Sequence, residues 1–265
     1  MKTTIALLTA ACLITACTQE TSEPVAEPAE PAAETEVSIY AAAVASESRL
    51  ETDRASDAGR KPGAVLELFG IQPGDVVLEM WAGGGYYTEL LAHVVGEDGK
   101  VIVHANTPIL NFAGEAHTKR HADNRLPNTE ILMAENNELA LEADSFDAIT
   151  IVLNYHDLYW ASEQYGWEQI DVGQFLAEIF KGLKPGGVLG IVDHQAASGS
   201  PSETGNTLHR IDSAIVIAEL QEAGFELDGQ SDVLANPEDD HSKSVFDPEI
   251  RGNTDRYVLR FRKPE

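Results

Sequence analysis

The chain has 265 residues, and 18 basic against 44 acidic residues give it a formal net charge of −26. So acidic a protein repels phosphate groups, and we expect neither a nucleic-acid partner nor binding to anionic lipid heads. Both cysteines, Cys12 and Cys17, stand near the N-terminus. Disulfides, cysteine nucleophiles and thiolate zinc sites are therefore excluded from residues 18–265.

The first 17 residues predict an export signal. Lys2 precedes a short apolar stretch at residues 3–14, which is too short for a permanent membrane-spanning helix. The sequence Leu-Ile-Thr-Ala-Cys ending at Cys17 resembles a bacterial lipobox, which implies a diacylated Cys17 as a membrane anchor. Because Thr18 rather than aspartate follows, the resemblance to Gram-negative lipoproteins favours the outer membrane, with the protein facing the periplasm. The alternative is an ordinary signal peptide with a chance cysteine.

The segment after the signal predicts a tether and then one domain. Residues 18–37 are rich in Glu, Pro, Ala and Thr, and such a segment has too little apolar surface to fold, so we expect a disordered tether. Residues 38–265 have the length of a single large α/β domain.

Within that domain, predicted helices and strands alternate. Helical composition covers residues 38–61 and 64–69, and helices are predicted at 87–95, 108–123, 172–183 and 208–223. Strands are predicted at 76–80, 101–105, 130–134, 146–153 and 188–192, followed by a late pair at 225–233 and 256–262. The polar segment 236–243 between the late strands is interpreted as a flexible surface loop. The pattern predicts a doubly wound α/β fold with a mostly parallel sheet and a C-terminal antiparallel hairpin.

Three consecutive glycines follow the first strand of the sheet. Gly83, Gly84 and Gly85 allow positive φ and close approach of a ligand to the backbone, and the next helix offers free N–H groups at its N-terminus. Glu79 lies inside the strand, four residues before Gly83. Glycine turns occur in many α/β proteins, but here a Ser-Phe-Asp strand opening at 145–147 and a Leu-Lys-Pro-Gly-Gly turn at 183–187 accompany it.

This set of segments, in this order, resembles the class I S-adenosylmethionine-dependent methyltransferases over roughly residues 60–263. The chain is more specifically similar to predicted methyltransferases of exported bacterial lipoproteins. That similarity rests on Trp-Ala-Gly-Gly-Gly-Tyr-Tyr-Thr at 81–88, Asn-Tyr-His-Asp at 154–157 and Leu-His-Arg-Ile-Asp at 208–212. The resemblance implies a Rossmann-like, seven-stranded sheet, with S-adenosylmethionine across the carboxyl ends of the strands. It also implies methyl transfer to an unidentified small acceptor.

The resemblance implies where each part of the cofactor binds. Glu79 and the glycine turn would line its methionine end. The residues after the third strand would lie near the adenine, and Asn154 would face the methyl group. The implied binding residues are Glu79, Gly83, Gly84, Gly85, Asn106, Glu135, Asn136 and Asn154.

Two positions depart from the family pattern. Trp81 stands where the first glycine of the turn is usual. The second strand ends in Val-His-Ala-Asn at 103–106 without the acid that grips both ribose hydroxyls, and the neutral Asn106 would bond to one hydroxyl more weakly.

Histidines and aspartates are predicted to gather at the carboxyl end of the sheet: His104, His156, Asp157, Asp193, His194, His209 and Asp212. Three interpretations stay open. A histidine acts as a general base, with His156 and His194 the strongest candidates and Asp157 or Asp193 orienting the ring; or the group binds a divalent metal; or it caps helices and links loops. We assign catalytic roles to His156, Asp157 and His194, and no residue is assigned as a metal ligand.

Two functions follow from these patterns. The first is methyl transfer from S-adenosylmethionine by a membrane-anchored, exported enzyme. The alternative is a protein of the same fold without methyl transfer, which uses a metal or another small molecule at the histidine and aspartate cluster as a lyase, hydrolase or binding protein. A purely structural envelope lipoprotein is a third, weaker hypothesis. The sequence does not indicate an oligomeric state.

Overall fold

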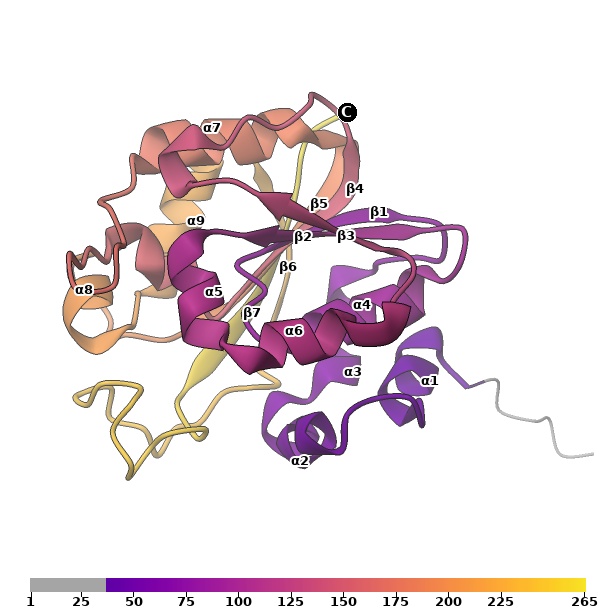
Figure 1. Ribbon diagram of the computed structural model, residues 1–265. Coiled ribbons are helices and arrows are strands. Elements are labelled where there is room, and N and C mark those ends of the chain that lie inside the picture. The colour runs from indigo at the N-terminus through magenta and orange to yellow at the C-terminus, as the bar shows by residue number, and fades with distance from the viewer. Residues whose placement is uncertain (1–36) are drawn as a thin grey trace, which may run out of the picture. The chain divides into compact units, whose positions relative to one another are not determined.

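The structure, a computed structural model, describes residues 37–265 (Figure 1). The predicted signal at 1–17 and the predicted tether, apart from its last residue, lie outside the described residues. Among the described helices, none has the length and apolar character needed to cross a bilayer.

A seven-stranded sheet forms the centre of the described part, in the order β3-β2-β1-β4-β5-β7-β6. The strands are β1 (Val76–Met80), β2 (Lys100–Ala105), β3 (Thr129–Met133), β4 (Phe146–Val152), β5 (Leu183–His194), β6 (Glu226–Ser231) and β7 (Arg256–Arg262). Strands β1 to β5 are parallel, whereas β7 runs antiparallel to both β5 and β6. The predicted fold class, including the C-terminal antiparallel hairpin, is confirmed.

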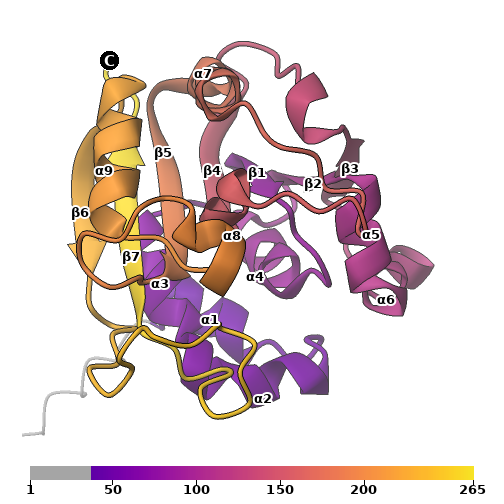
Figure 2. The ribbon, with the colours of Figure 1, turned by 90° about the vertical axis from the view of Figure 1, so that its left-hand side faces the viewer.

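Helices cover both faces of the sheet (Figures 1 and 2). One face carries α1 (Ile39–Ala45), α3 (Pro62–Phe69) and α4 (Tyr86–Val95), and the other carries α7 (Val172–Gly182) and α9 (Ser213–Glu222). Side chains alternate along β1, so Val77 belongs to the same buried cluster as Leu90 of α4, whereas Leu78 belongs to the cluster that contains Ile179 of α7. This two-sided burial explains why the central strands are almost wholly apolar.

The remaining helices complete the described chain. They are α2 (Glu51–Arg60), α5 (Thr107–Ala113), α6 (Glu115–His121), α8 (Thr204–Leu208) and three 3-10 helices, η1 (Ala122–Asn124), η2 (Asn136–Glu138) and η3 (Tyr155–Tyr159). The η2 and η3 helices directly follow the carboxyl ends of β3 and β4, and they place polar side chains there.

Three predicted boundaries were wrong. The helix predicted at 108–123 breaks at Gly114, whose φ of 53° and ψ of −132° end α5 before α6 begins. The Lys-Pro-Gly-Gly segment at 184–187 does not precede a strand but lies within β5, because a bulge absorbs it between the pairs Phe146–Leu183 and Ala148–Val188. The helix predicted at 208–223 begins only at Ser213, as α9, because Leu208 is the last residue of α8 and residues 209–212 are not helical.

The segment 236–243 is also anchored, contrary to the prediction of a flexible surface loop. Asp239 is buried and forms an ion pair of 2.9 Å with the fully buried Arg210. The guanidinium of Arg210 further donates to the carbonyl oxygens of Lys243 and Gln195. These contacts fix the segment against the residues that follow β5.

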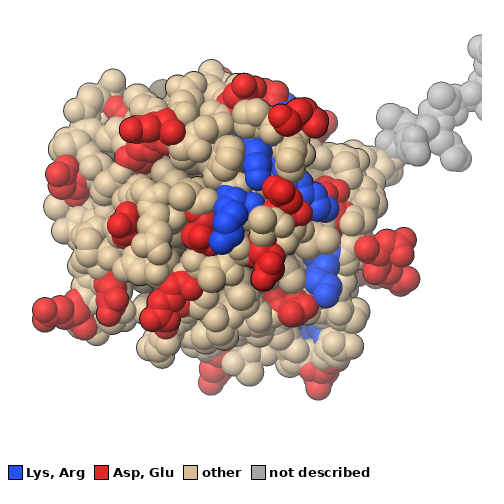
Figure 3. Space-filling view, turned by 90° about the horizontal axis from the view of Figure 1, so that it is seen from above, with Lys and Arg blue, Asp and Glu red and all other residues tan. Residues whose placement is uncertain are grey.

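The surface shows more acidic than basic side chains (Figure 3). On the face in Figure 3, acidic side chains are scattered from edge to edge and a smaller number of basic side chains gather near the middle. The expected lack of a nucleic-acid partner stays a prediction.

Candidate active site

The glycine turn joins β1 to α4, and its glycines have different surroundings. Gly83 and Gly85 have φ values of 58° and 78°. A Cβ at Gly85 would stand 2.8 Å from Cγ of Arg120, so packing alone requires glycine there. A Cβ at Gly84 would lie 3.2 Å from Cβ of Ala116 in α6, which is a tight contact. At Gly83 a Cβ would have only the Trp81 carbonyl oxygen nearby, at 3.9 Å, so this part of the backbone is open to a ligand.

Glu79 lies buried beneath the turn. Its carboxyl accepts a 2.5 Å hydrogen bond from Oγ1 of Thr88 in α4. Burial raises the pKa of Glu79 to about 7, against the opposing effects of the Thr88 hydrogen bond and the charge of Arg120. The carboxyl therefore exchanges its proton near neutrality.

This raised pKa makes stability depend on pH. Between the ordinary value of 4.5 and about 7, the folded chain holds the Glu79 proton and the unfolded chain releases it. The free energy of unfolding therefore falls as pH rises through this window, by on the order of 3 kcal/mol for this one group. We expect Glu79→Gln to remove this contribution to the pH dependence of the free energy of unfolding. Urea unfolding at about pH 5 and about pH 7.5 measures that dependence for the variant and for the natural chain. Equal slopes for the variant and the natural chain would contradict this prediction.

Trp81 contacts Asn136, one of the residues that the resemblance places near the adenine of the cofactor. Its backbone is left-handed, with φ of 49°, and its side chain is only 2% exposed. The indole stacks on Phe175 of α7 at 5.0 Å between ring centroids and 8° between ring planes. Its Nε1 donates a 2.8 Å hydrogen bond to Oδ1 of Asn136, the residue expected near the adenine.

The other residues expected at the nucleoside are also bonded within the chain. Nδ2 of the buried Asn106 donates to Oδ1 of Asn136 at 2.8 Å, and Oδ1 of Asn106 accepts from the backbone of Ile109. The exposed Glu135 accepts from Thr107. The residues present therefore fit the methionine end of S-adenosylmethionine, but they do not fit its nucleoside end while Trp81 keeps this position.

The second part of the site follows β4 and β5. Nδ1 of His156, in η3, donates to Oδ1 of the fully buried Asp193 at 2.8 Å, and Asp193 also accepts from the His156 backbone. Nδ2 of Asn154 donates to Oδ2 of Asp157 at 3.1 Å. The two strand ends thus bring together the candidate residues Asn154, His156 and Asp157.

Neighbouring charges set the protonation of this group. Burial by itself would lower the pKa of His156, but the carboxylates of Asp193 and Asp157 outweigh it and raise the pKa to about 9. Burial opposes the ionisation of Asp157, but the charge of His156 lowers its pKa below the ordinary value. At neutral pH, His156 is therefore positive and Asp157 negative.

His194 has the opposite character. Burial, followed by the positive charge of His156, lowers its pKa well below the ordinary value, so its imidazole is neutral at pH 7. Its ring centroid lies 5.9 Å from that of His156, and its Nδ1 lies 2.7 Å from Oγ1 of Thr254. Of these two candidate bases, His194 is the one that can accept a proton at neutral pH.

Two residues of the predicted cluster have other roles. His104 is fully buried beside Trp81, donates from Nε2 to the Ala134 carbonyl, and burial lowers its pKa to about 4. Asp212 caps α9 by accepting from the backbone of Ala214. His209, in contrast, joins the cluster, with Nδ1 3.4 Å from Oδ1 of Asp157.

The structure also brings in residues that the sequence did not single out. These are Thr88 against Glu79, Thr254 against His194, and Arg210 beside His209. Thr88 and Arg210 lie inside the motifs quoted at 81–88 and 208–212, but neither side chain was given a role there, and Thr254 lies outside every motif. Thr254 also lines a polar cavity of about 520 Å³ whose other lining residues come mainly from α2 and residues 234–256. None of the lining residues belongs to the glycine turn.

The comparisons with known proteins indicate the family and the fold of the chain. The ubiE/COQ5 methyltransferase family matches residues 60–200, just over half of the chain. A ubiquinone/menaquinone biosynthesis C-methyltransferase of Teredinibacter turnerae is 27% identical over 145 residues, which are 54% of this chain and 53% of the relative. The corresponding protein of Vibrio vulnificus is 29% identical over 129 residues, 48% of this chain and 44% of the relative. The chain thus matches about half the length of these curated relatives.

A solved structure shows the same fold. A SAM-dependent methyltransferase from Aquifex aeolicus aligns with 80% of this chain and 95% of its own, with a TM-score of 0.57 and 22% identity. At that identity the likeness establishes the fold alone. The family match covers the glycine turn, the β4 end with its histidine and the β5 end with Asp193 and His194. The chain belongs to the ubiE/COQ5 methyltransferase family.

Proposed function

We propose that this chain transfers a methyl group from S-adenosylmethionine to a small acceptor at the carboxyl ends of β1, β4 and β5. The observation that carries the proposal is the open backbone at Gly83, between the buried Glu79 and the N-terminus of α4. Asn154, at the end of the adjacent strand, supports it by adding a polar group on the same edge of the sheet. Family membership supplies the reaction class.

The chain's own residues have defined tasks in this proposal. The cofactor supplies an electrophilic methyl group when it is bound. The neutral imidazole of His194 takes the proton that the acceptor loses. Its lowered pKa keeps the imidazole unprotonated, and so able to accept a proton, at neutral pH. The polar cavity bordered by Thr254, which touches His194, is the proposed route for the acceptor. Positioning of the two reactants contributes the rest of the rate enhancement.

Binding of the nucleoside requires the Trp81 side chain to leave its stacked position. Because the indole is buried and hydrogen-bonded, this displacement costs free energy, and we expect the affinity for the cofactor to be low.

Calorimetric titration of the full chain with S-adenosylhomocysteine tests the proposal. We expect weak saturable binding that is lost in Gly83→Leu, because the added side chain fills the open face of the turn. Gly74→Leu is the matched control, since Gly74 also has positive φ and open space but lies before β1, at the opposite end of the strand. Binding that survives Gly83→Leu, or that both variants lose equally, would refute the proposed site.

The burial of Trp81 favours a second candidate function. If the indole never leaves, the fold is retained without methyl transfer, and the chain acts as a lyase, hydrolase or binding protein at the histidine cluster. Absence of S-adenosylhomocysteine binding both in the natural chain and after removal of the indole would support this alternative.

We also propose that Cys17 carries a lipid that holds the protein to the outer membrane, with the folded domain in the periplasm. The Leu-Ile-Thr-Ala-Cys segment supports this proposal. Labelling cells with radioactive palmitate would test it, because the natural chain should take up label and Cys17→Ser should not.

A further inference from the structure

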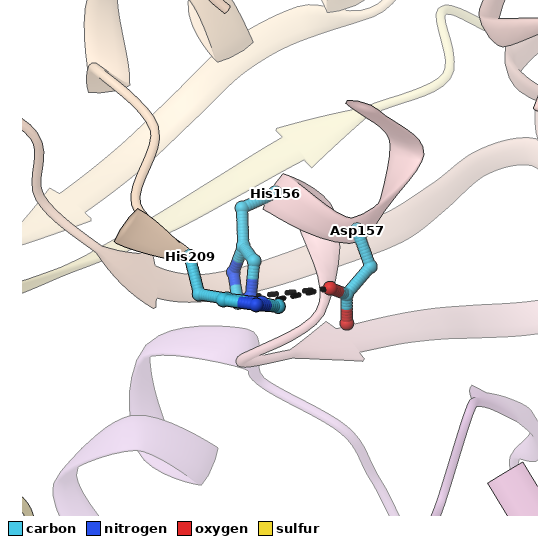
Figure 4. A group of neighbouring side chains, drawn as sticks. All are labelled: His156, Asp157 and His209. Atoms are coloured by element: carbon cyan, nitrogen blue, oxygen red, sulfur yellow. Dashed lines mark ion pairs between the residues drawn. The ribbon is translucent and has the colours of Figure 1, made fainter. Parts of the chain in front are cut away.

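Three side chains from two separate parts of the chain converge beside the end of β4. His156 and Asp157 come from η3, and His209 comes from the residue after α8 (Figure 4). Oδ1 of Asp157 lies 3.4 Å from Nε2 of His156 and 3.4 Å from Nδ1 of His209. One ligand atom from each of the three residues lies within 4.8 Å of the other two.

These distances suit a shared ion better than direct hydrogen bonds. Hydrogen bonds between N–H and oxygen are about 2.7–3.2 Å long, which is shorter than both contacts. Ligands about 2.0–2.1 Å from a tetrahedral zinc ion stand about 3.3 Å apart. The nitrogen-to-oxygen distances of 3.4 Å therefore match the distances between neighbouring ligands of a zinc ion.

Neighbouring groups hold two of the three ligands in place. The hydrogen bond from Nδ1 of His156 to Asp193 directs Nε2 toward the other two ligands, as carboxylates commonly do behind metal-bound histidines. Asn154 donates a hydrogen bond to Oδ2 of Asp157, which leaves Oδ1 facing the imidazoles. His209 has a left-handed backbone, with φ of 54°, a conformation that costs free energy for a residue other than glycine.

We propose that His156, Asp157 and His209 bind a divalent first-row transition metal such as Zn²⁺, with Asp193 orienting His156. The metal displaces the proton from Nε2 of His156 and releases it to solvent, because only a neutral imidazole can be a ligand. Two imidazole nitrogens and one carboxylate favour zinc or iron over magnesium or calcium, which prefer oxygen ligands. Three protein ligands leave a coordination position for an oxygen or nitrogen of a small molecule.

The proposed metal complements His194 and does not replace it. A coordinated hydroxyl loses its proton more readily, and His194 is a neighbouring imidazole outside the ligand set. Metal binding is measured without cofactor or acceptor, so its outcome and that of the methyl-transfer proposal are independent.

The test is metal binding by the full chain, purified without a polyhistidine tag and without chelator. We expect about one zinc ion per chain by elemental analysis, and visible absorption bands when Co²⁺ replaces it. His209→Asn and Asp157→Asn should each weaken zinc binding by at least tenfold. Asparagine is chosen at position 209 because it tolerates the left-handed backbone there. Asp193→Asn should weaken it about 10- to 100-fold, because it removes the support of His156.

His241→Asn is the matched control. His241 also has a left-handed backbone and pairs with one aspartate, Asp255 at 2.9 Å, but it lies outside the cluster. Zinc binding that is retained in His241→Asn and weakened in the three cluster variants supports the site. A natural chain that binds no zinc or cobalt, or cluster variants that bind as tightly as the natural chain, would overturn it. Circular dichroism of each variant shows whether a loss of zinc binding results from unfolding of the variant.

Discussion

The Trp81→Gly variant is expected to bind S-adenosylhomocysteine about a hundredfold more tightly than the natural chain. Removing a buried tryptophan side chain from its packing costs about 3–5 kcal/mol, and every 1.4 kcal/mol changes an equilibrium tenfold. The natural chain must supply that free energy when the nucleoside enters, although the displaced indole recovers part of it through new contacts. In the variant the space is already open, and glycine also suits the left-handed backbone at this position.

Trp167→Gly is the control for this measurement. Trp167 is 3% exposed and its ring lies 5.9 Å from that of Trp81, so its removal opens a cavity in the same apolar cluster. It does not hydrogen-bond to Asn136, and we expect this variant to lose stability without a comparable gain in affinity. Titration calorimetry and urea unfolding of both variants separate the two effects. If Trp81→Gly binds no better than Trp167→Gly, the indole does not obstruct the nucleoside.

The Asp239→Asn variant is expected to lower the free energy of unfolding by about 3–5 kcal/mol, because it leaves the charge of Arg210 buried without a partner. Arg210 is fully buried and donates to both carboxylate oxygens of Asp239, at 3.1 and 2.9 Å. A loss of this size is a large part of the stability of an ordinary domain. Because Arg210 adjoins His209, we also expect zinc binding to weaken.

The neighbouring Asp240 provides the control for Asp239. Its carboxylate is exposed and accepts hydrogen bonds from the backbone and side chain of Ser242, so Asp240→Asn should change the free energy of unfolding by less than about 0.5 kcal/mol. Urea unfolding of both variants measures the difference. Similar stabilities for the two variants would show that the Arg210–Asp239 pair does not anchor this segment.

Removing a charge from either position changes the net charge equally. A difference between the two variants therefore reports the buried pair and not the overall acidity of the chain.

Residues close together in sequence determined much of this protein. Apolar runs bounded by turns specified the five parallel strands, and the glycines after β1 marked the turn at the carboxyl end of the sheet. Because parallel strands end at one edge, the sequence also predicted that His156 and Asp193 lie near each other, and they are hydrogen-bonded. These features depend on local periodicity and on strand direction, both of which can be derived from sequence.

The tertiary structure decided the contacts that depend on side-chain direction and on distant pairs. At the end of β1, the backbone angle of Trp81 turns its indole toward α7, and no periodic pattern specifies that direction. His104 was expected in the histidine cluster but is buried beside Trp81. His209 joins the cluster because α8 ends just before it, whereas a single helix at 208–223 was predicted. The pairing of Arg210 with Asp239 spans 29 residues, and only the folded chain brings the two charges together.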